Sequence, residues 1–240
     1  MTADEYARWV LATPKPVEIV QPQASYFVCG TPRCGSWFLC GLLAGTAVAG
    51  RPHEWFWQDT RASLMRAWGV AGFDAYVELV LAAGTTPNGV FGAKVMWGHL
   101  PELSPFPQPR FVWLRRRDRL AQAVSFAKAI QTGHWHGWDP APKAEPVFNA
   151  GAIEALIHEV DEHECCWADW FGARSVEALE LSFEDLLSDP EAQTLRVLDF
   201  LGLRLPEGAA IHALTRSQND GLNADWCARY RAAAASPSGR

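Results

Sequence analysis

A glycine-rich turn in the first part of the chain has the spacing of a phosphate-binding loop. Gly30 and Gly35 are separated by four residues, between a short apolar run at 26–29 and a helical pattern at 35–48. A turn from a strand into a helix directs backbone N–H groups and the positive end of the helix dipole at an anion. The segment therefore predicts an anion site, in which Arg33 adds a positive charge from inside the loop. An ordinary strand–turn–helix connection is the alternative interpretation.

This loop lacks two residues on which nucleoside triphosphate sites depend. Ser36 and Trp37 stand where such a loop carries a lysine for the β- and γ-phosphates and a Ser or Thr for Mg²⁺. We therefore expect no metal here, and a ligand group that carries less charge than a terminal phosphate. A sulfuryl group, with one negative charge in a phosphosulfate, meets this description.

Two candidate proton acceptors and a strand lysine occur further along the chain. His53 and Glu54 lie in "GRPHEWFW", where the flanking aromatic side chains are expected to desolvate the carboxylate and raise its pKa. Either side chain can take the proton of an attacking hydroxyl. Lys94 lies in the apolar pattern "FGAKVMW", where an ammonium group is costly to bury unless it meets an anion. That anion is expected to be a bound sulfate group, the acceptor or an internal carboxylate.

The order of predicted elements describes a fold that brings these residues together. Strands are expected at 26–29, 90–96, 110–114 and 176–181, and helices at 35–48, 60–68, 73–83, 118–132, 153–171 and 191–201. Strands separated by helices favour a parallel sheet with helices on both faces. We therefore predict a single α/β domain, residues 1–240, built as a P-loop-like three-layer sandwich.

Two segments fall outside this pattern. Residues 134–149 are rich in Pro, Trp and His and are too long for a plain connection, so they are expected to form a lid, an acceptor-binding loop or a poorly ordered insert. Trp135 and Trp138 in this segment suit stacking against a sugar or another ring, and a core-filling role is the alternative. The tail 232–240 is small and polar and is expected to fray.

Composition excludes several classes of protein. The 240 residues are 49% hydrophobic with a net charge of −6, which suits a folded domain and argues against a general nucleic-acid binder. There is no basic-then-apolar leader and no apolar run of the about 18–20 residues that a membrane span needs. The six cysteines lack the C-x-x-C spacing of zinc ligands and are expected to be buried free thiols. A cytoplasmic protein is the resulting expectation.

Several segments together resemble the bacterial sulfotransferases that use 3′-phosphoadenosine-5′-phosphosulfate (PAPS), in the trehalose 2-sulfotransferase-like family. The similar segments are "TPRCGSWFL", "TAVAGRPHEWFW", "TPNGVFGAKVMW", "RRRDRLAQAVSFAKAIQTGHW" and "NADWCARYR", which span most of the chain. The resemblance implies the sulfotransferase fold and a metal-free in-line transfer of a sulfuryl group to a hydroxyl. PAPS would be the donor, and 3′-phosphoadenosine-5′-phosphate (PAP) the product.

The resemblance also implies roles for single residues. The loop that binds the 5′ end of the donor would consist of Arg33, Cys34, Gly35, Ser36 and Trp37. Arg117 and Ser125, eight residues apart, would bind the 3′-phosphate, with Arg115 and Arg116 as alternatives. Glu54 would be the general base with His53 as its alternative, and Lys94 is a further catalytic candidate.

The chain departs from the family pattern at three positions. Cys34 and Trp37 replace Ser and Thr in the loop, and Arg51 stands where trehalose-acting members carry an acid. Arginine only donates hydrogen bonds, so the acceptor is expected to be something other than simply trehalose. The acceptor would be a small molecule, a glycan or a glycolipid, met by Arg51, His53 and Trp135, and a homodimer is possible. A small-molecule kinase and a non-catalytic nucleotide-binding relative remain the alternatives.

Overall fold

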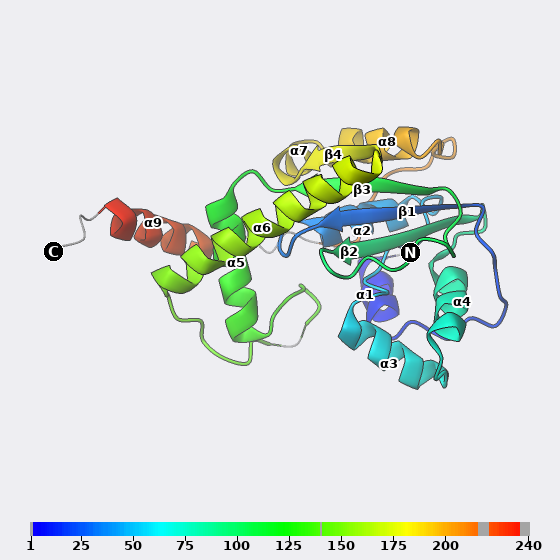
Figure 1. The fold of residues 1–240 in the computed structure, drawn as a ribbon, viewed down its shortest axis with the longest axis horizontal. Coiled ribbons are helices and arrows are strands. Elements are labelled where there is room, and N and C mark those ends of the chain that lie inside the picture. The colour runs from blue at the N-terminus through cyan, green and yellow to red at the C-terminus, as the bar shows by residue number, and fades with distance from the viewer. Residues whose placement is uncertain (1, 140, 216–220, 236–240) are drawn as a thin grey trace.

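Four parallel strands form the central sheet of the protein (Figure 1). The computed structural model describes residues 2–139, 141–215 and 221–235. The strands are β1 (Ala24–Gly30), β2 (Val90–Met96), β3 (Pro109–Arg115) and β4 (Ala178–Ser182), and they lie in the order β2-β1-β3-β4. Each neighbouring pair runs parallel. The predicted α/β fold with a central parallel sheet is therefore confirmed.

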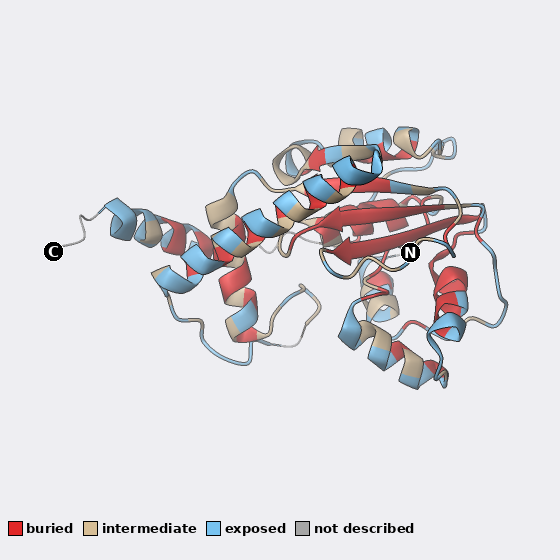
Figure 2. Ribbon diagram, in the orientation of Figure 1, coloured by how far each residue is buried: buried red, intermediate tan, exposed pale blue. Residues whose placement is uncertain are grey.

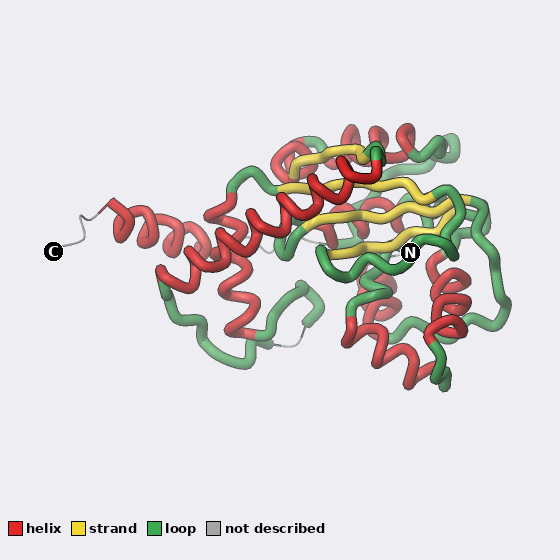
Figure 3. The backbone as a smooth tube through the Cα atoms, in the orientation of Figure 1, coloured by secondary structure: helices red, strands yellow, loops and turns green. Residues whose placement is uncertain are grey.

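Helices flank this sheet on both faces (Figure 3). In the described ranges they are α1 (Ala3–Leu11), α2 (Ser36–Gly45), α3 (Gln58–Trp68), α4 (Phe73–Gly84), α5 (Arg119–Thr132), α6 (Ala150–Arg174), α7 (Phe183–Ser188), α8 (Pro190–Phe200) and α9 (Gly221–Ala235). Figure 1 shows α9 at the end of the molecule far from the sheet, where its residues pack with α5 and α6.

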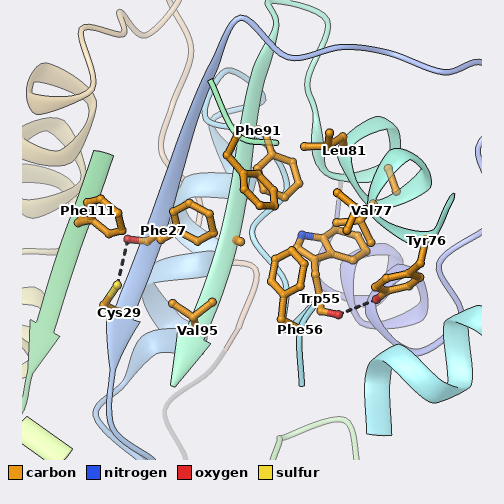
Figure 4. Close-up of a cluster of buried hydrophobic side chains, with 14 of the residues drawn as sticks. Phe27, Cys29, Trp55, Phe56, Tyr76, Val77, Leu81, Phe91, Val95 and Phe111 are labelled. Atoms are coloured by element: carbon orange, nitrogen blue, oxygen red, sulfur yellow. Dashed lines mark hydrogen bonds between the residues drawn. The ribbon is translucent and has the colours of Figure 1, made fainter. Parts of the chain in front are cut away.

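The two faces of the sheet have separate cores, because successive strand residues point to opposite sides. On one face, Phe27 and Phe91 pack with α3, α4 and α6. Figure 4 shows part of this core, in which the Tyr76 hydroxyl donates to the carbonyl of Trp55 at 2.6 Å. On the other face, Val28 packs with α2, α7 and α8. Strands β1 and β2 are consequently buried along almost their whole length (Figure 2).

The carboxyl ends of the central strands meet at one edge of the sheet. Gly30 at the end of β1 pairs with Met96 at the end of β2, and Cys29 pairs with Trp113 of β3. The loops that follow these strands therefore lie close together. In open parallel sheets this edge is where ligands bind, especially where the chain moves from one side of a strand to the other. β1 is such a strand, because β2 lies on one side of it and β3 on the other.

Three described helices, α1, α7 and α9, lie outside the predicted helix ranges. α1 begins with a capping box in which Thr2 and Glu5 bond each other's backbone N–H through their side chains. α7 follows β4 directly, and the Ser182 hydroxyl caps it by accepting from Asp185 N at 3.1 Å. β4 also begins two residues later than predicted, because α6 continues to Arg174 before it ends.

The two irregular segments have different outcomes. Residues 134–149 contain no helix or strand at the positions that the structure describes, and part of the segment lies against the cavity described below. In the tail, α9 continues to Ala235, whereas 236–240 lie outside the described residues. Whether 134–149 acts as a lid stays a prediction.

The cysteines are free thiols, as predicted, but not all of them are buried. Cys165 is exposed and Cys166 is half-buried on α6, so the expectation of burial is wrong for this pair. In the described ranges no single helix has the length and apolar composition of a membrane span. α3 and α4 would together meet that test by length and composition only, and they meet at 91°.

Candidate active site

A cavity of about 1040 Å³ opens at the carboxyl edge of the sheet. Its wall combines the glycine loop, the start of α2, the segment 54–60, the end of β2 and the segment 135–138 with parts of α1, α5 and α6. The predicted site residues that line it are Arg33, Gly35, Ser36, Trp37, Glu54, Lys94, Ser125 and Trp135. The predicted site residues that do not line it are Cys34, Arg51, His53 and Arg117.

The glycine loop holds its shape through two residues with positive φ. Arg33 has φ 64°, and Gly35, which precedes the first turn of α2, has φ 89°. A Cβ atom on Gly35 would lie 2.1 Å from the ring of Phe183, so this position needs glycine both for its backbone and for space. The first turn of α2 consequently faces the cavity through Ser36 and Trp37, while Cys34 is fully buried in the core that α2 forms with the sheet.

Arg33 carries positive charge into the cavity wall. Its Nε donates to Ser125 Oγ at 2.9 Å, and its Nη1 donates to the carbonyl of Trp135. Burial and the neighbouring Arg116 lower the pKa of Arg33 to about 10, so it stays protonated at neutral pH. The structure therefore brings together Arg33, Ser125 and Trp135 from three separate segments of the chain.

The neighbouring arginines at the end of β3 differ in where their side chains go. Arg117 is 60% exposed and forms two hydrogen bonds to the carboxylate of Asp185, with Glu184 alongside. Arg116 lines the cavity, donates to the carbonyl of Arg33 at 3.3 Å and lies over the ring of Phe183. Of these two arginines, Arg116 therefore lines the cavity with Ser125, whereas Arg117 does not.

The guanidinium of Arg116 has no carboxylate partner in the described part of the chain. Among the described residues no carboxylate lies within ion-pair distance of it, and its Nε is buried without a hydrogen-bond partner. Burial lowers its pKa, and the nearby charges of Asp118 and Glu184 oppose this shift. A buried N–H without a partner is costly, so a bound anion would relieve this cost.

Glu54 and Lys94, which also line the cavity, form a largely buried ion pair. Lys94 is 4% exposed and Glu54 is 19% exposed. Their contact follows from the backbone, because Lys94 N donates to the carbonyl of His53 at 2.9 Å and so holds the segment beside β2. The Lys94 ammonium also lies 5.0 Å from the centre of the Trp37 ring. Of the anions expected for Lys94, the structure shows the internal carboxylate.

The predicted rise in the pKa of Glu54 is wrong. Burial does raise the pKa, but the charge and hydrogen bond of Lys94 outweigh it, and the net pKa of Glu54 lies below its ordinary value. The sequence showed the aromatic neighbours, whereas the ammonium comes from a strand forty residues away. Glu54 is therefore ionised at neutral pH and able to accept a proton.

His53 is part of the core rather than the cavity wall. Its Nε2 lies 3.0 Å from the carbonyl of Val10, and its ring stacks on Trp55 at 4.8 Å between centroids. Burial lowers the pKa of His53 to about 4. The imidazole is thus neutral at pH 7 and does not line the cavity, whereas Glu54 does.

Arg51 also lies away from the cavity. Its guanidinium lies over the ring of Trp9, 5.9 Å from the ring centre, and donates to the carbonyl of Ala83 at 3.5 Å. Besides Glu54, the acids that line the cavity are Asp4, Asp59 and Glu159. The structure consequently gives no support to a contact between Arg51 and an acceptor.

Several cavity residues were not predicted. They include Asp4 of α1, Met96, Trp97, His99, Glu159, His163 and Phe183, whereas Arg116 was predicted as an alternative to Arg117. Some of them carry a signal: Trp97 and His99 directly follow β2, at the edge where parallel sheets bind ligands. The Thr2–Glu5 capping box likewise marks α1 in the sequence.

Two groups of charged side chains with different chemistry line the cavity. One group has the guanidinium groups of Arg33 and Arg116 with the Ser125 hydroxyl, which suits a multiply charged anion. The other has an ionised carboxylate paired with an ammonium, and the aromatic side chains Trp37, Trp57 and Trp97 line the same cavity. The N-terminal turn of α2 also lines it. This arrangement can hold an anion against a helix N-terminus and present a base to a second molecule.

The sequence matches known sulfotransferases over most of its length. The sequence model of the family described as Stf0 sulphotransferase matches residues 25–106 and 104–233. A trehalose 2-sulfotransferase of Mycobacterium tuberculosis (strain ATCC 35801 / TMC 107 / Erdman) is 31% identical over an alignment of 256 residues, gaps included. The alignment covers 87% of this chain and 95% of that protein. A trehalose 2-sulfotransferase of Mycolicibacterium smegmatis (strain ATCC 700084 / mc(2)155) is 29% identical, with 86% and 94% covered.

Among solved structures, the fold is similar to the sulfotransferase domain from the Synechococcus PCC 7002 olefin synthase. The TM-score is 0.50 with 16% sequence identity, and the match covers 94% of this chain and 93% of that domain. At this identity the likeness supports the fold alone.

Proposed function

Because the chain belongs to the Stf0 sulphotransferase family and is thus a sulfotransferase, we propose that it transfers a sulfuryl group from PAPS to a hydroxyl of a small-molecule acceptor, with Glu54 as the base. The observation that carries the donor assignment is the pair of arginines, Arg33 and Arg116, that lines the same cavity as Glu54. The named relatives support a carbohydrate acceptor for this chain as well.

This pair of arginines supports a nucleotide with phosphate at both the 3′ and 5′ positions. Arg116 and Ser125 would bind the 3′-phosphate, and Arg33, Ser36 and the N-terminal turn of α2 would bind the 5′ end. We propose Arg116 in place of Arg117, since Arg117 is held outside the cavity by Asp185. The buried, unpartnered Nε of Arg116 fits such a ligand.

At the proposed acceptor site, Glu54 would accept the hydroxyl proton while the acceptor oxygen forms its bond to sulfur and the bond from sulfur to the phosphate oxygen breaks. The donor supplies an activated sulfuryl group for this exchange. The ionised state of Glu54 suits it as a proton acceptor. Lys94 fixes the carboxylate and places a positive charge beside the reacting groups. A metal-free mechanism stays a prediction.

Calorimetry with three ligands tests the donor assignment. By calorimetry, we expect PAP to bind more tightly than adenosine 5′-phosphate. In a thermal unfolding assay, we expect PAP to raise the melting temperature and Mg-ATP to raise it little. A charge-assisted hydrogen bond contributes about 1.5–3 kcal/mol, so Arg116→Ala is expected to weaken PAP binding by about 10–100-fold. Arg117→Ala is the matched control and is expected to have a much smaller effect.

Other outcomes would support the alternatives. Equal affinity for PAP and adenosine 5′-phosphate would contradict the proposed 3′-phosphate site. Thermal stabilisation by Mg-ATP alone would support a kinase. Binding of PAP with no sulfation of trehalose or of hydroxyl compounds in a cell extract, assayed with labelled donor, would support a non-catalytic relative. Trehalose is the first acceptor to assay, given the named relatives.

A further inference from the structure

A closed ring of hydrogen bonds lies beside the glycine loop. Thr31 Oγ1 donates to Glu164 Oε1 at 3.3 Å and accepts from Gln122 Nε2 at 2.8 Å. Gln122 Oε1 accepts from Arg119 Nη1 at 3.1 Å, and Arg119 Nη2 lies 3.3 Å from Glu164 Oε2. Thr31 and Gln122 are fully buried and Glu164 is 3% exposed. The ring therefore joins the loop to α5 and α6, and among its four side chains Arg119 is the partly exposed one, at 21%.

The ring also holds the backbone of both halves of the proposed donor site. Gln122 Nε2 donates to the carbonyl of Pro32, which precedes Arg33 in the loop, at 2.8 Å. Arg119 Nη1 donates to the carbonyl of Arg116 at 2.8 Å. One side-chain network thus fixes the positions of the two arginines that face the cavity.

Glu164 supplies the negative charge of this network. Besides Arg119, it accepts from Arg115 Nε at 2.5 Å, at the end of β3. A carboxylate at this depth is costly unless it is paired, and its removal would leave Arg115 and Arg119 short of a partner. Glu164 thereby holds Arg115 and Arg119, neither of which lines the cavity, whereas Arg33 and Arg116 do.

We propose that Glu164 is a positioning residue for the donor: through Thr31, Gln122 and Arg119 it sets the spacing between the 5′ loop and the 3′-phosphate site. A nucleotide with two phosphates benefits from both sites only if their spacing matches the ligand, since the second contact is then made at no further cost in translational freedom. This inference rests on the proposed function, because it needs a donor with phosphates at both positions.

The test compares the affinities of PAP and adenosine 5′-phosphate by calorimetry in matched variants of the full chain. Thr31→Val removes the hydroxyl at nearly constant volume, Thr31→Ser keeps it, and Glu164→Gln removes the charge at constant shape. We expect Thr31→Val and Glu164→Gln to lower the ratio of the two affinities by about tenfold. Thr31→Ser is expected to keep the ratio within about threefold of the wild type, since its hydroxyl is retained.

A purely structural role would lower both affinities together and leave their ratio unchanged, which would overturn the proposal. Asp161→Asn is a further control, because Asp161 binds Arg119 Nε at 3.0 Å from outside the ring and is expected to leave the ratio unchanged. If Glu164→Gln does not fold, the Thr31 pair decides alone. A wild-type chain that binds the two nucleotides equally would overturn both this inference and the proposed function, whereas discrimination retained in Thr31→Val would overturn this inference only.

Discussion

Replacing Glu54 by glutamine separates its chemical role from its structural one. The amide keeps the shape of the side chain but cannot accept the hydroxyl proton, so kcat is expected to fall by about 10²–10⁴-fold with the affinity for PAP nearly unchanged. The substitution also leaves Lys94, which is 4% exposed, without its carboxylate. Loss of one partner of a buried pair costs about 3–5 kcal/mol, and the opening of this pair onto the cavity reduces that figure to about 1–3 kcal/mol. The melting temperature is then expected to fall by about 3–10 °C.

The matched variant Lys94→Met tests the same pair from the other side. Lys94 outweighs burial in setting the pKa of Glu54, so without it the pKa is expected to rise above the ordinary value of 4.5. The fall in the wild-type rate due to protonation of Glu54 should therefore have its midpoint below pH 4.5, whereas the midpoint for Lys94→Met should lie at a higher pH. The assay is kcat against pH at saturating donor, with thermal unfolding of each variant alongside.

Two results would refute this reasoning. A Glu54→Gln variant that keeps more than about a tenth of the wild-type kcat would show that Glu54 is not the base. A Lys94→Met profile that coincides with the wild-type profile would show that Lys94 does not control the charge of Glu54.

Three further predictions follow from the residues around the site. His53 has a pKa of about 4 in the folded chain and about 6.5 in the unfolded chain, so the unfolded chain binds a proton more readily. The free energy of unfolding should therefore fall by up to about 3 kcal/mol as the pH drops from 6.5 to 4. Denaturant unfolding at pH 7 and pH 4.5 should show a smaller fall for His53→Phe than for the wild type. Gly35→Ala should destabilise the chain more than Gly69→Ala, since both positions have positive φ but only Gly35 is crowded, by Phe183; equal losses in urea unfolding would contradict the crowding. Arg51→Glu should change kcat/KM for the acceptor by less than about threefold, and a selective change above tenfold would return Arg51 to the acceptor site.

The sheet could be predicted because its signals are local. β2 occupies the predicted range 90–96, and the predicted ranges of β1 and β3 fall within the observed strands. A buried parallel strand is a short apolar run between turn signals, which can be read without knowing its neighbours. α1 has a capping box in its sequence, but the prediction does not include it. Its apolar side chains, such as Tyr6, are buried by contacts with residues far away in the chain, which the local pattern does not show.

The site could be predicted only in part, because long-range pairing decides which side chain faces the cavity. The spacing to Ser125 favoured Arg117, yet Asp185, 68 residues later in the chain, binds that arginine and leaves Arg116 at the cavity. The motif around Arg51 predicts that this residue faces the acceptor. In the structure Arg51 instead contacts Trp9 and Ala83, which lie far from it in the sequence.

The docking of α1 has a consequence for the order in which the site forms. α1 contributes Asp4 to the cavity wall, and Tyr6 packs against Trp138, while the carbonyl of Val10 contacts His53. On the ribosome, α1 is synthesised before every one of these partners, and Trp138 follows it by more than a hundred residues. We therefore expect α1 to pack only after these partners have been synthesised, and its apolar side chains to be exposed, and accessible to chaperones, until then. We therefore expect the part of the cavity wall that α1 contributes to form later in folding than the glycine loop, whose strand and helix are neighbours in the chain.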